Sequence, residues 1–206
     1  FFRYIPVEEF LFYALGFTAI LSSYIWCDEY WLSAYNVPDY ENPADETGTR
    51  GLPRSIVQTQ LAAPLMISAA LVGAAFVYKR FGPHNNHDGF PSYFTFLVLA
   101  SLFPSMLFFR STRRFVNWRA VSFSVLWVTL TSLIWEATLA APYGWWGYKP
   151  RHMLGLSIDA WYGLPVEAAL LWLSVTFTTV TVYEMFKILN AMKRVNGQGW
   201  WEAMFG

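Results

Sequence analysis

The sequence predicts an all-α polytopic membrane protein with five transmembrane helices, on two observations. The first is composition: of 206 residues, 55% are hydrophobic, 20% are aromatic and only 14% are charged. A soluble domain carries about 25% charged residues, so this chain has too few to cover a surface that faces water. The second is that the apolar residues form continuous runs of about 20, the length with which an α-helix crosses a bilayer. Continuous runs also argue against a β-barrel, whose strands alternate apolar and polar residues.

Five segments have the length and hydrophobicity of a transmembrane helix: 5–27, 60–78, 90–109, 118–140 and 161–189. Residues 31–58 are acidic and contain proline, and we expect an extramembrane loop there. Residues 82–89 predict a turn, and 110–114 form a short basic loop. The loop at 141–160 is rich in Trp and Tyr, which suit the headgroup level of a membrane. Residues 195–206 form a C-terminal tail.

Basic residues are distributed unevenly between the two sides of the predicted helices. Of the 14 Lys and Arg residues, five fall on the side of the N-terminus and nine on the other. Because cytoplasmic loops are enriched in Lys and Arg, we expect the C-terminus in the cytoplasm and the chain in the cell (inner) membrane.

Several kinds of site and partner are excluded by the composition. Basic and acidic residues balance at 14 each, so no basic surface indicates a nucleic-acid partner. Cys27 is the only cysteine, which excludes an internal disulfide. The sequence has no G-x-G-x-x-G or P-loop pattern and no cluster of metal ligands, so we expect neither a cofactor nor a metal.

Three glutamates lie at one depth in the predicted membrane region. Glu8 is near the start of the first span, Glu136 near the end of the fourth and Glu167 near the start of the fifth. Because successive helices alternate in direction, we expect all three carboxyl groups on one side, about 5–9 Å from the helix ends. Ionisable groups at this depth cost several kcal/mol and are retained mainly for function or a specific pairing. Glu184 lies near the opposite end of the fifth span and is excluded from this set.

Hydroxyl side chains share the helix faces of Glu136 and Glu167, which favours an inward orientation. They are Ser122, Thr129 and Ser132 on the fourth span, and Ser174, Thr178 and Thr181 on the fifth. These hydroxyl groups could equally serve only to bond one helix to another or to carbonyls of their own helix. The sequence does not distinguish a role in a site from a role in helix bonding.

A short motif occurs twice at predicted helix starts. Residues 6–8 and 165–167 both read Pro-Val-Glu, and the two prolines are 159 positions apart. Proline is tolerated in the first helical turn, where its missing N–H would have no partner. A carboxylate one turn into the helix is stabilised by the positive end of the helix dipole. The match indicates equivalent ends of two repeated helices.

The motif is part of a longer pattern in the second half of the chain. Glu136 is followed by a Gly-Trp-Trp-Gly-Tyr-Lys-Pro segment at 144–150, by Arg151 and Leu154-Gly155, and by the motif at 165–167. In this pattern the sequence resembles the membrane-embedded lycopene cyclases of the heterodimeric bacterial or fused fungal and archaeal type. The resemblance is strongest over 131–172 and 4–12. Glu136 stands where this family usually has Asp, and Ala168 where it often has a second acid.

The resemblance implies a seven-helix bundle built from two three-helix repeats. Residues 1–30 would be the third helix of a first repeat, and two further helices are expected upstream. Residues 59–110 would hold a linker helix and the first helix of the second repeat, and 111–194 its remainder.

The resemblance also implies carotenoid biosynthesis, with cyclisation of the linear ψ end groups of lycopene or a related carotenoid to ionone rings. Such a reaction is a net isomerisation and needs no redox cofactor. Protonation of an isolated carbon–carbon double bond needs a neutral carboxylic acid in a dry site, and desolvation raises the pKa of a buried glutamic acid. We expect Glu8 and Glu167 as the acid–base pair and Glu136 as a third or orienting group, with the roles of donor and acceptor open.

Aromatic side chains near these acids are expected to contact the substrate and to stabilise a carbocation. The expected substrate-binding residues are Trp135, Trp145, Trp146, Tyr162, Pro6 and Pro165. As an alternative, each Trp or Tyr would anchor the chain at the membrane interface.

Other functions stay open. Water capture by the same cation would make a carotenoid hydratase, and related membrane terpene cyclases act on meroterpenoid epoxides. A non-catalytic pigment- or quinone-binding subunit would instead pair its glutamates with Lys or Arg. The expected partners are a hydrophobic polyene and the lipid bilayer, and the choice between homo-oligomer and hetero-oligomer stays open.

Overall fold

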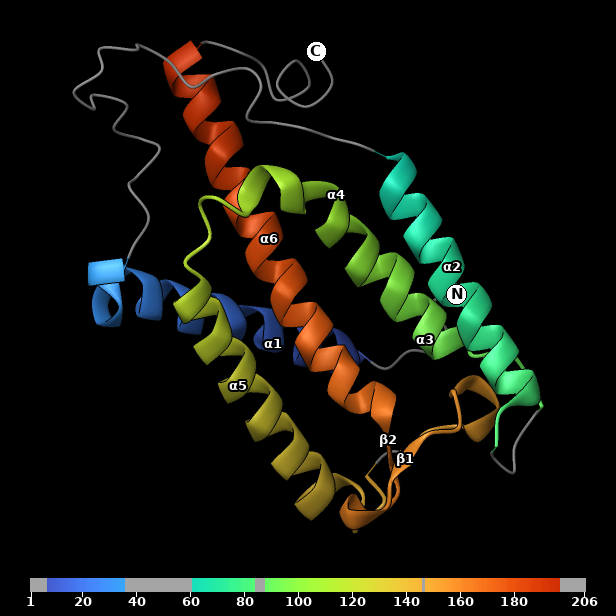
Figure 1. Cartoon of the computed structure of the whole chain (residues 1–206). Helices are drawn as coiled ribbons and strands as arrows, with labels where there is room; N and C mark the ends of the chain where they lie inside the picture. Colours follow the sequence, from blue (N-terminus) through green and yellow to red (C-terminus); the bar gives the residue numbers. More distant parts are fainter. Residues whose placement is uncertain (1–6, 36–60, 84–87, 146, 197–206) are drawn as a thin grey trace.

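The computed structural model describes residues 7–35, 61–83, 88–145 and 147–196. Within these ranges five helical segments are long and apolar enough to cross a membrane, which confirms the predicted fold class. The segments are Phe10–Trp31, Ala62–Phe81, Ser92–Thr112, Trp118–Ala140 and Val166–Lys193. Figure 1 shows them as one bundle.

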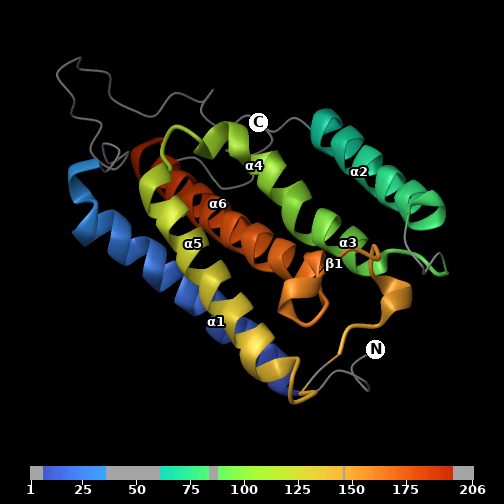
Figure 2. The ribbon, with the colours of Figure 1, turned by 60° about the horizontal axis from the view of Figure 1, so that its bottom comes forward.

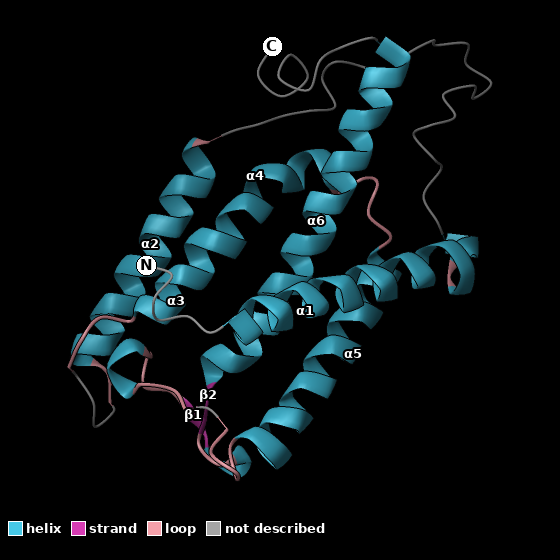
Figure 3. Ribbon diagram, turned by 180° about the vertical axis from the view of Figure 1, so that it is seen from behind, coloured by secondary structure: helices cyan, strands magenta, loops and turns pink. Residues whose placement is uncertain are grey.

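Helix α6 (Val166–Asn196) is the centre of the bundle. It packs against α1 (Val7–Trp26), α5 (Trp118–Trp135) and α4 (Phe103–Thr112), whereas α2 (Ala62–Phe81) lies at the edge against α4. Figure 2 shows α2, α4, α6, α5 and α1 in this order across the molecule. Seen from behind in Figure 3, α1 crosses α6 and α5 obliquely.

Large apolar side chains cover the outward faces of the helices, as expected for helices that face lipid. Examples are Leu15, Met66 and Leu126, each more than half exposed. Lipid chains are as apolar as these side chains, so association of the helices depends on close packing and on polar contacts between them.

Three of the five spans contain one π-helical turn. These turns are η1 (Cys27–Trp31), η4 (Val98–Leu102, between α3, Ser92–Leu97, and α4) and η5 (Glu136–Ala140, at the end of α5). The apolar pattern predicts uninterrupted helices and contains no sign of these turns, although Pro104, which has no N–H to donate, follows the second one. The third begins at Glu136, and π-turns are frequent at functional sites.

Hydroxyl groups bond α6 to the adjacent span in the middle of the bundle. The Oγ1 atom of Thr178 lies 2.6 Å from Ser101 Oγ and 2.7 Å from Ser105 Oγ. Thr178 thus bonds one helix to another, as one of the two interpretations of these hydroxyl groups expected. Ser122 is exposed and donates to the Trp118 carbonyl of its own helix, so the expected inward orientation is wrong for this residue.

The last span begins later than the predicted residue 161. Residues Asp159–Trp161 form a short 3-10 turn, and Tyr162 and Gly163 follow with φ of 55° and 67°. These left-handed conformations cannot continue a helix. A two-stranded ribbon comes next, in which β1 (Ser157–Ile158) pairs antiparallel with β2 (Leu164–Pro165). The helix starts directly after Pro165.

Asn117 connects α5 to α1 at the end of α5 opposite to Glu136. Its side-chain oxygen accepts hydrogen bonds from the backbone N–H groups of residues 119 and 120, which caps α5. Its side-chain amide donates to Asp28 Oδ1 at 2.9 Å. Asn117 and Asp28 are both buried. The sequence predicts instead that each lies at a helix end, next to an exposed loop.

The same end of the bundle holds Glu184 of α6. The hydroxyl group of Tyr24 in α1 donates to Glu184 Oε1 at 2.8 Å, and Lys187 Nζ lies 3.6 Å from the same oxygen. The backbone N–H of Asn117 donates in turn to the Tyr24 hydroxyl at 3.4 Å. One buried network therefore joins α1, α5 and α6.

We expect Asn117→Ala to lower the free energy of unfolding by about 2 kcal/mol, because the change removes a helix cap and leaves buried Asp28 without this donor. The measurement is unfolding with sodium dodecyl sulfate in mixed micelles, followed by circular dichroism. The matched control on the same helix is Ser122→Ala, which should change the value by less than about 0.5 kcal/mol. Equal effects of the two changes would contradict the role given to Asn117.

Candidate functional site

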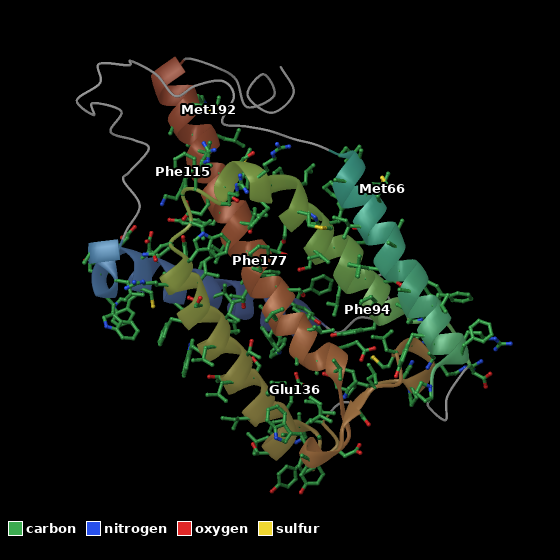
Figure 4. All side chains as sticks on the ribbon, viewed as in Figure 1. Met66, Phe94, Phe115, Glu136, Phe177 and Met192 are labelled. Atoms are coloured by element: carbon green, nitrogen blue, oxygen red, sulfur yellow. The ribbon has the colours of Figure 1, made fainter. Side chains whose placement is uncertain are left out.

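Glu136 is a buried carboxyl group at the start of the π-turn η5, which joins α5 to the loop before α6 (Figure 4). Its side chain is 3% exposed. The hydroxyl group of Tyr148, in that loop, donates a hydrogen bond to Glu136 Oε2 at 2.7 Å. The indole N–H of Trp172 in α6 also faces this carboxyl group, without the geometry of a well-formed hydrogen bond.

An aromatic cavity of about 860 Å³ lies on one side of Glu136. Its walls come from α1, α3, α6 and the loop between α5 and α6. The lining residues are Phe12, Tyr13, Ser92, Tyr93, Phe96, Glu136, Trp145, Gly147, Tyr148, Lys149, His152, Met153, Leu171 and Trp172. With Tyr148, seven of these fourteen residues are Phe, Tyr or Trp, so aromatic residues make up half of the lining beside this carboxyl group.

Phe12 of α1 is the ring that connects the aromatic residues of three helices. Its centroid lies 6.0 Å from that of Trp135 in α5, in a stacked arrangement, and 5.8 Å from that of Trp172, in an edge-to-face arrangement. Such aromatic pairs are worth roughly 0.5–1.5 kcal/mol beyond the area they bury. Gly16 lies one turn further along α1. Its lack of a side chain lets α1 approach α6, since a Cβ atom there would lie 3.3 Å from the Trp172 ring.

A second cavity of about 720 Å³ lies on the loop side of Glu136. Its lining residues are Pro83, Glu136, Ala141, Gly147, Tyr148, Pro150, Met153, Gly155, Leu156, Ser157, Asp159, Tyr162, Gly163, Leu164 and Pro165. Four residues, Glu136, Gly147, Tyr148 and Met153, line both cavities. We call these four the partition, because they border both the aromatic cavity and the loop-side cavity.

Two of the three predicted glutamates, Glu136 and Glu167, have different surroundings. Glu136 lines both cavities, whereas Glu167 lines neither. Glu167 is 0% exposed in the first turn of α6, and its Oε1 atom accepts a short hydrogen bond from the backbone N–H of Leu154. Glu8 belongs to the first turn of α1, and its side chain lies outside the described residues.

Only some of the predicted substrate-binding residues line a cavity. Trp145 lines the aromatic cavity, and Tyr162 and Pro165 line the loop-side cavity. Trp135 lines neither cavity, but it stacks on Phe12 and lies 6.0 Å from Trp145. Pro6 and Trp146 lie outside the described residues.

Sequence reasoning missed Tyr148, Phe12 and Trp172 as site residues. Tyr148 had a detectable signal, because it lies in the Gly-Trp-Trp-Gly-Tyr segment on which the resemblance depends. Phe12 and Trp172 had none, since each is one of many aromatic residues in an apolar helix. Only the packing of α1 and α6 with α5 brings their rings to the cavity that Glu136 lines.

The arrangement suits transfer of a proton to an apolar molecule. Glu136 has one hydroxyl donor on its carboxyl group, and among the described residues it makes no ion pair. In the part of the chain that the structure describes, no three His, Cys, Asp or Glu side chains are grouped so that they could hold a metal ion. Of the ionisable groups that line the aromatic cavity, Glu136 is a buried one, whereas Lys149 and His152 are exposed.

Comparison with known proteins adds no relative to this description. No family model, no curated protein and no solved structure matches the chain. The resemblance to membrane-embedded lycopene cyclases thus stays an expectation that depends on the motifs between Glu136 and Glu167.

Proposed function

We propose that the chain cyclises the ψ end group of lycopene or a related linear carotenoid by acid catalysis, and that Glu136 is the acid. The proposal depends on one observation: the buried carboxyl group of Glu136 borders a cavity of about 860 Å³ in which half of the lining residues are aromatic. A polyene end group is apolar and matches such walls. Protonation of its double bond requires a carboxylic acid in a water-poor site.

The proposed reaction is a net isomerisation, because the proton added in the first step is lost again in the last. Glu136 gives its proton to the terminal carbon–carbon double bond, which leaves a tertiary carbocation. The electron pair of the next suitable double bond attacks this cation and closes a six-membered ring, and the positive charge moves into the ring. Loss of one ring proton forms the new double bond, and the carboxylate left on Glu136 is the base that the geometry offers for this proton.

The aromatic walls suit the cationic intermediates. The faces of Phe, Tyr and Trp rings carry partial negative charge and attract cations. Phe12, Tyr93 and Trp172 supply such rings from three different helices. Tyr148 holds the carboxyl group by its hydroxyl hydrogen bond and lies 6.2 Å from Tyr93, measured between ring centroids.

We expect Glu136→Gln to reduce cyclisation at least about 100-fold, because the amide fills the same space but cannot donate the proton. The gene would be expressed in a lycopene-accumulating bacterium, with chromatography of the pigments and immunoblotting of the protein. Glu184→Gln, at the other end of the bundle, is the matched control and should retain activity, since a Gln oxygen still accepts from Tyr24. Unchanged lycopene with the wild-type chain would contradict the function, and an active Glu136→Gln variant would contradict the site.

We expect Phe12→Leu to slow cyclisation roughly 3- to 30-fold, because the leucine side chain is apolar but has no ring face for the cation. The rate would be measured as cyclised pigment per amount of protein. The control is Phe17→Leu on the same helix, since Phe17 is 43% exposed and lines neither cavity. A Phe12→Leu variant as active as the control would argue against cation stabilisation by this ring.

A second candidate function, hydration of the same cation, is favoured by the loop-side cavity. That cavity reaches Glu136 and carries the polar side chains of Ser157 and Asp159, whose Oγ and Oδ1 atoms are 3.0 Å apart. Water there could add to a carbocation before a ring closes. The pigment analysis separates the two reactions, because hydration adds one water to the mass of the carotenoid and cyclisation adds nothing.

A further inference from the structure

We propose that Glu167 and Lys79 are positioning residues that hold the segment 150–154 in place, so that Tyr148 reaches Glu136 and the partition between the two cavities stays closed. The inference rests on the proposed function for its effect on activity. It gives Glu167 a different task from the acid or base that its position in the sequence suggests.

Glu167 is attached to the loop and does not face a cavity. It is 0% exposed, and its Oε1 atom accepts the hydrogen bond from the backbone N–H of Leu154. Its Oε2 atom has no hydrogen-bond partner among the described residues. The hydrogen bond from the Leu154 N–H to this buried carboxyl group fixes the end of segment 150–154 to the first turn of α6.

Lys79 holds the other end of the same segment. It lies in the last turn of α2, its side chain is 1% exposed, and its Nζ atom donates to the Pro150 carbonyl at 2.9 Å. A buried ammonium group is costly unless opposite charges are near, and Glu167 and Asp88 are close enough to act electrostatically on it. Lys79 and Glu167 thus lie on two different helices and bond to the two ends of one loop segment.

The segment held in this way carries the wall of the site. Tyr148, which donates to Glu136, lies two residues before Pro150, and Met153 of the partition lies one residue before Leu154. Between them, Ser92 Oγ lies 2.9 Å from His152 Nδ1. Release of either end would let Met153 and Tyr148 move away from Glu136.

Comparison of Glu167→Gln with Glu167→Leu tests this role. The glutamine oxygen can still accept from the Leu154 N–H, so Glu167→Gln should retain cyclisation within about five-fold, whereas Glu167→Leu should lose at least about ten-fold, the change expected when a buried hydrogen bond is removed. A positioning residue is rescued by Gln, and a proton donor or acceptor is not. A Glu167→Gln variant as inactive as Glu136→Gln would overturn the proposal.

A second measurement does not depend on activity. In a chain with Cys27→Ala and Met153→Cys, the new thiol reports whether the partition is closed, since Met153 is 6% exposed. Labelling by a polar maleimide in membranes should be slow with Glu167 or Glu167→Gln, and at least about ten-fold faster with Glu167→Leu or Lys79→Met. Equal labelling rates in all four chains would overturn the positioning role, whether or not the wild-type chain cyclises lycopene. If the wild-type chain is inactive but the labelling differs as expected, the proposed function fails and the positioning role stands.

Discussion

The hydrogen bond between Tyr148 and Glu136 is the contact on which the site depends. A carboxyl group within a transmembrane helix is costly unless a polar partner meets it, and here that partner comes from the loop between α5 and α6. The loop must therefore fold back over the end of the bundle. Its return places Gly147 and Met153, like Glu136, at the border of both the aromatic cavity and the loop-side cavity.

The rest of the bundle holds this contact from both ends. α6 lies at the centre, and its first turn binds the loop through Glu167 while its distal part binds α1 through Glu184 and Tyr24. In the middle, Thr178 bonds to Ser101 and Ser105 of the adjacent span. In a bilayer, apolar side chains gain little free energy by moving from lipid to another helix. Polar contacts such as these therefore help to determine which helix faces meet. Glu167, Thr178 and Glu184 of α6 thus each bond to a different element, at three depths of the bundle.

The sequence predicts the spans well and the site in part. Length and hydrophobicity are local properties, so the five helices follow from runs of apolar residues, and a buried Glu136 follows from the cost of an acid at that depth. The roles of individual side chains depend on tertiary contacts, and they cannot be predicted from these local properties. Glu136 and Glu167 look equivalent in the sequence, yet one faces a cavity and the other binds a backbone N–H, because the loop returns between them. Likewise, the helical period gives no reason for a π-turn to start at Glu136 or for Phe12 to reach Trp172.

Under the proposed function, a carboxyl group of this protein protonates a carbon–carbon double bond of a carotenoid. The most direct measurement is incubation of the purified chain with lycopene in lipid vesicles made in D₂O, followed by mass spectrometry of the product. We expect a cyclised carotenoid that carries deuterium at a non-exchangeable carbon position, since the carboxyl proton exchanges with the solvent between turnovers. Recovery of unchanged lycopene, or of a ring product without deuterium, would contradict the proposed function.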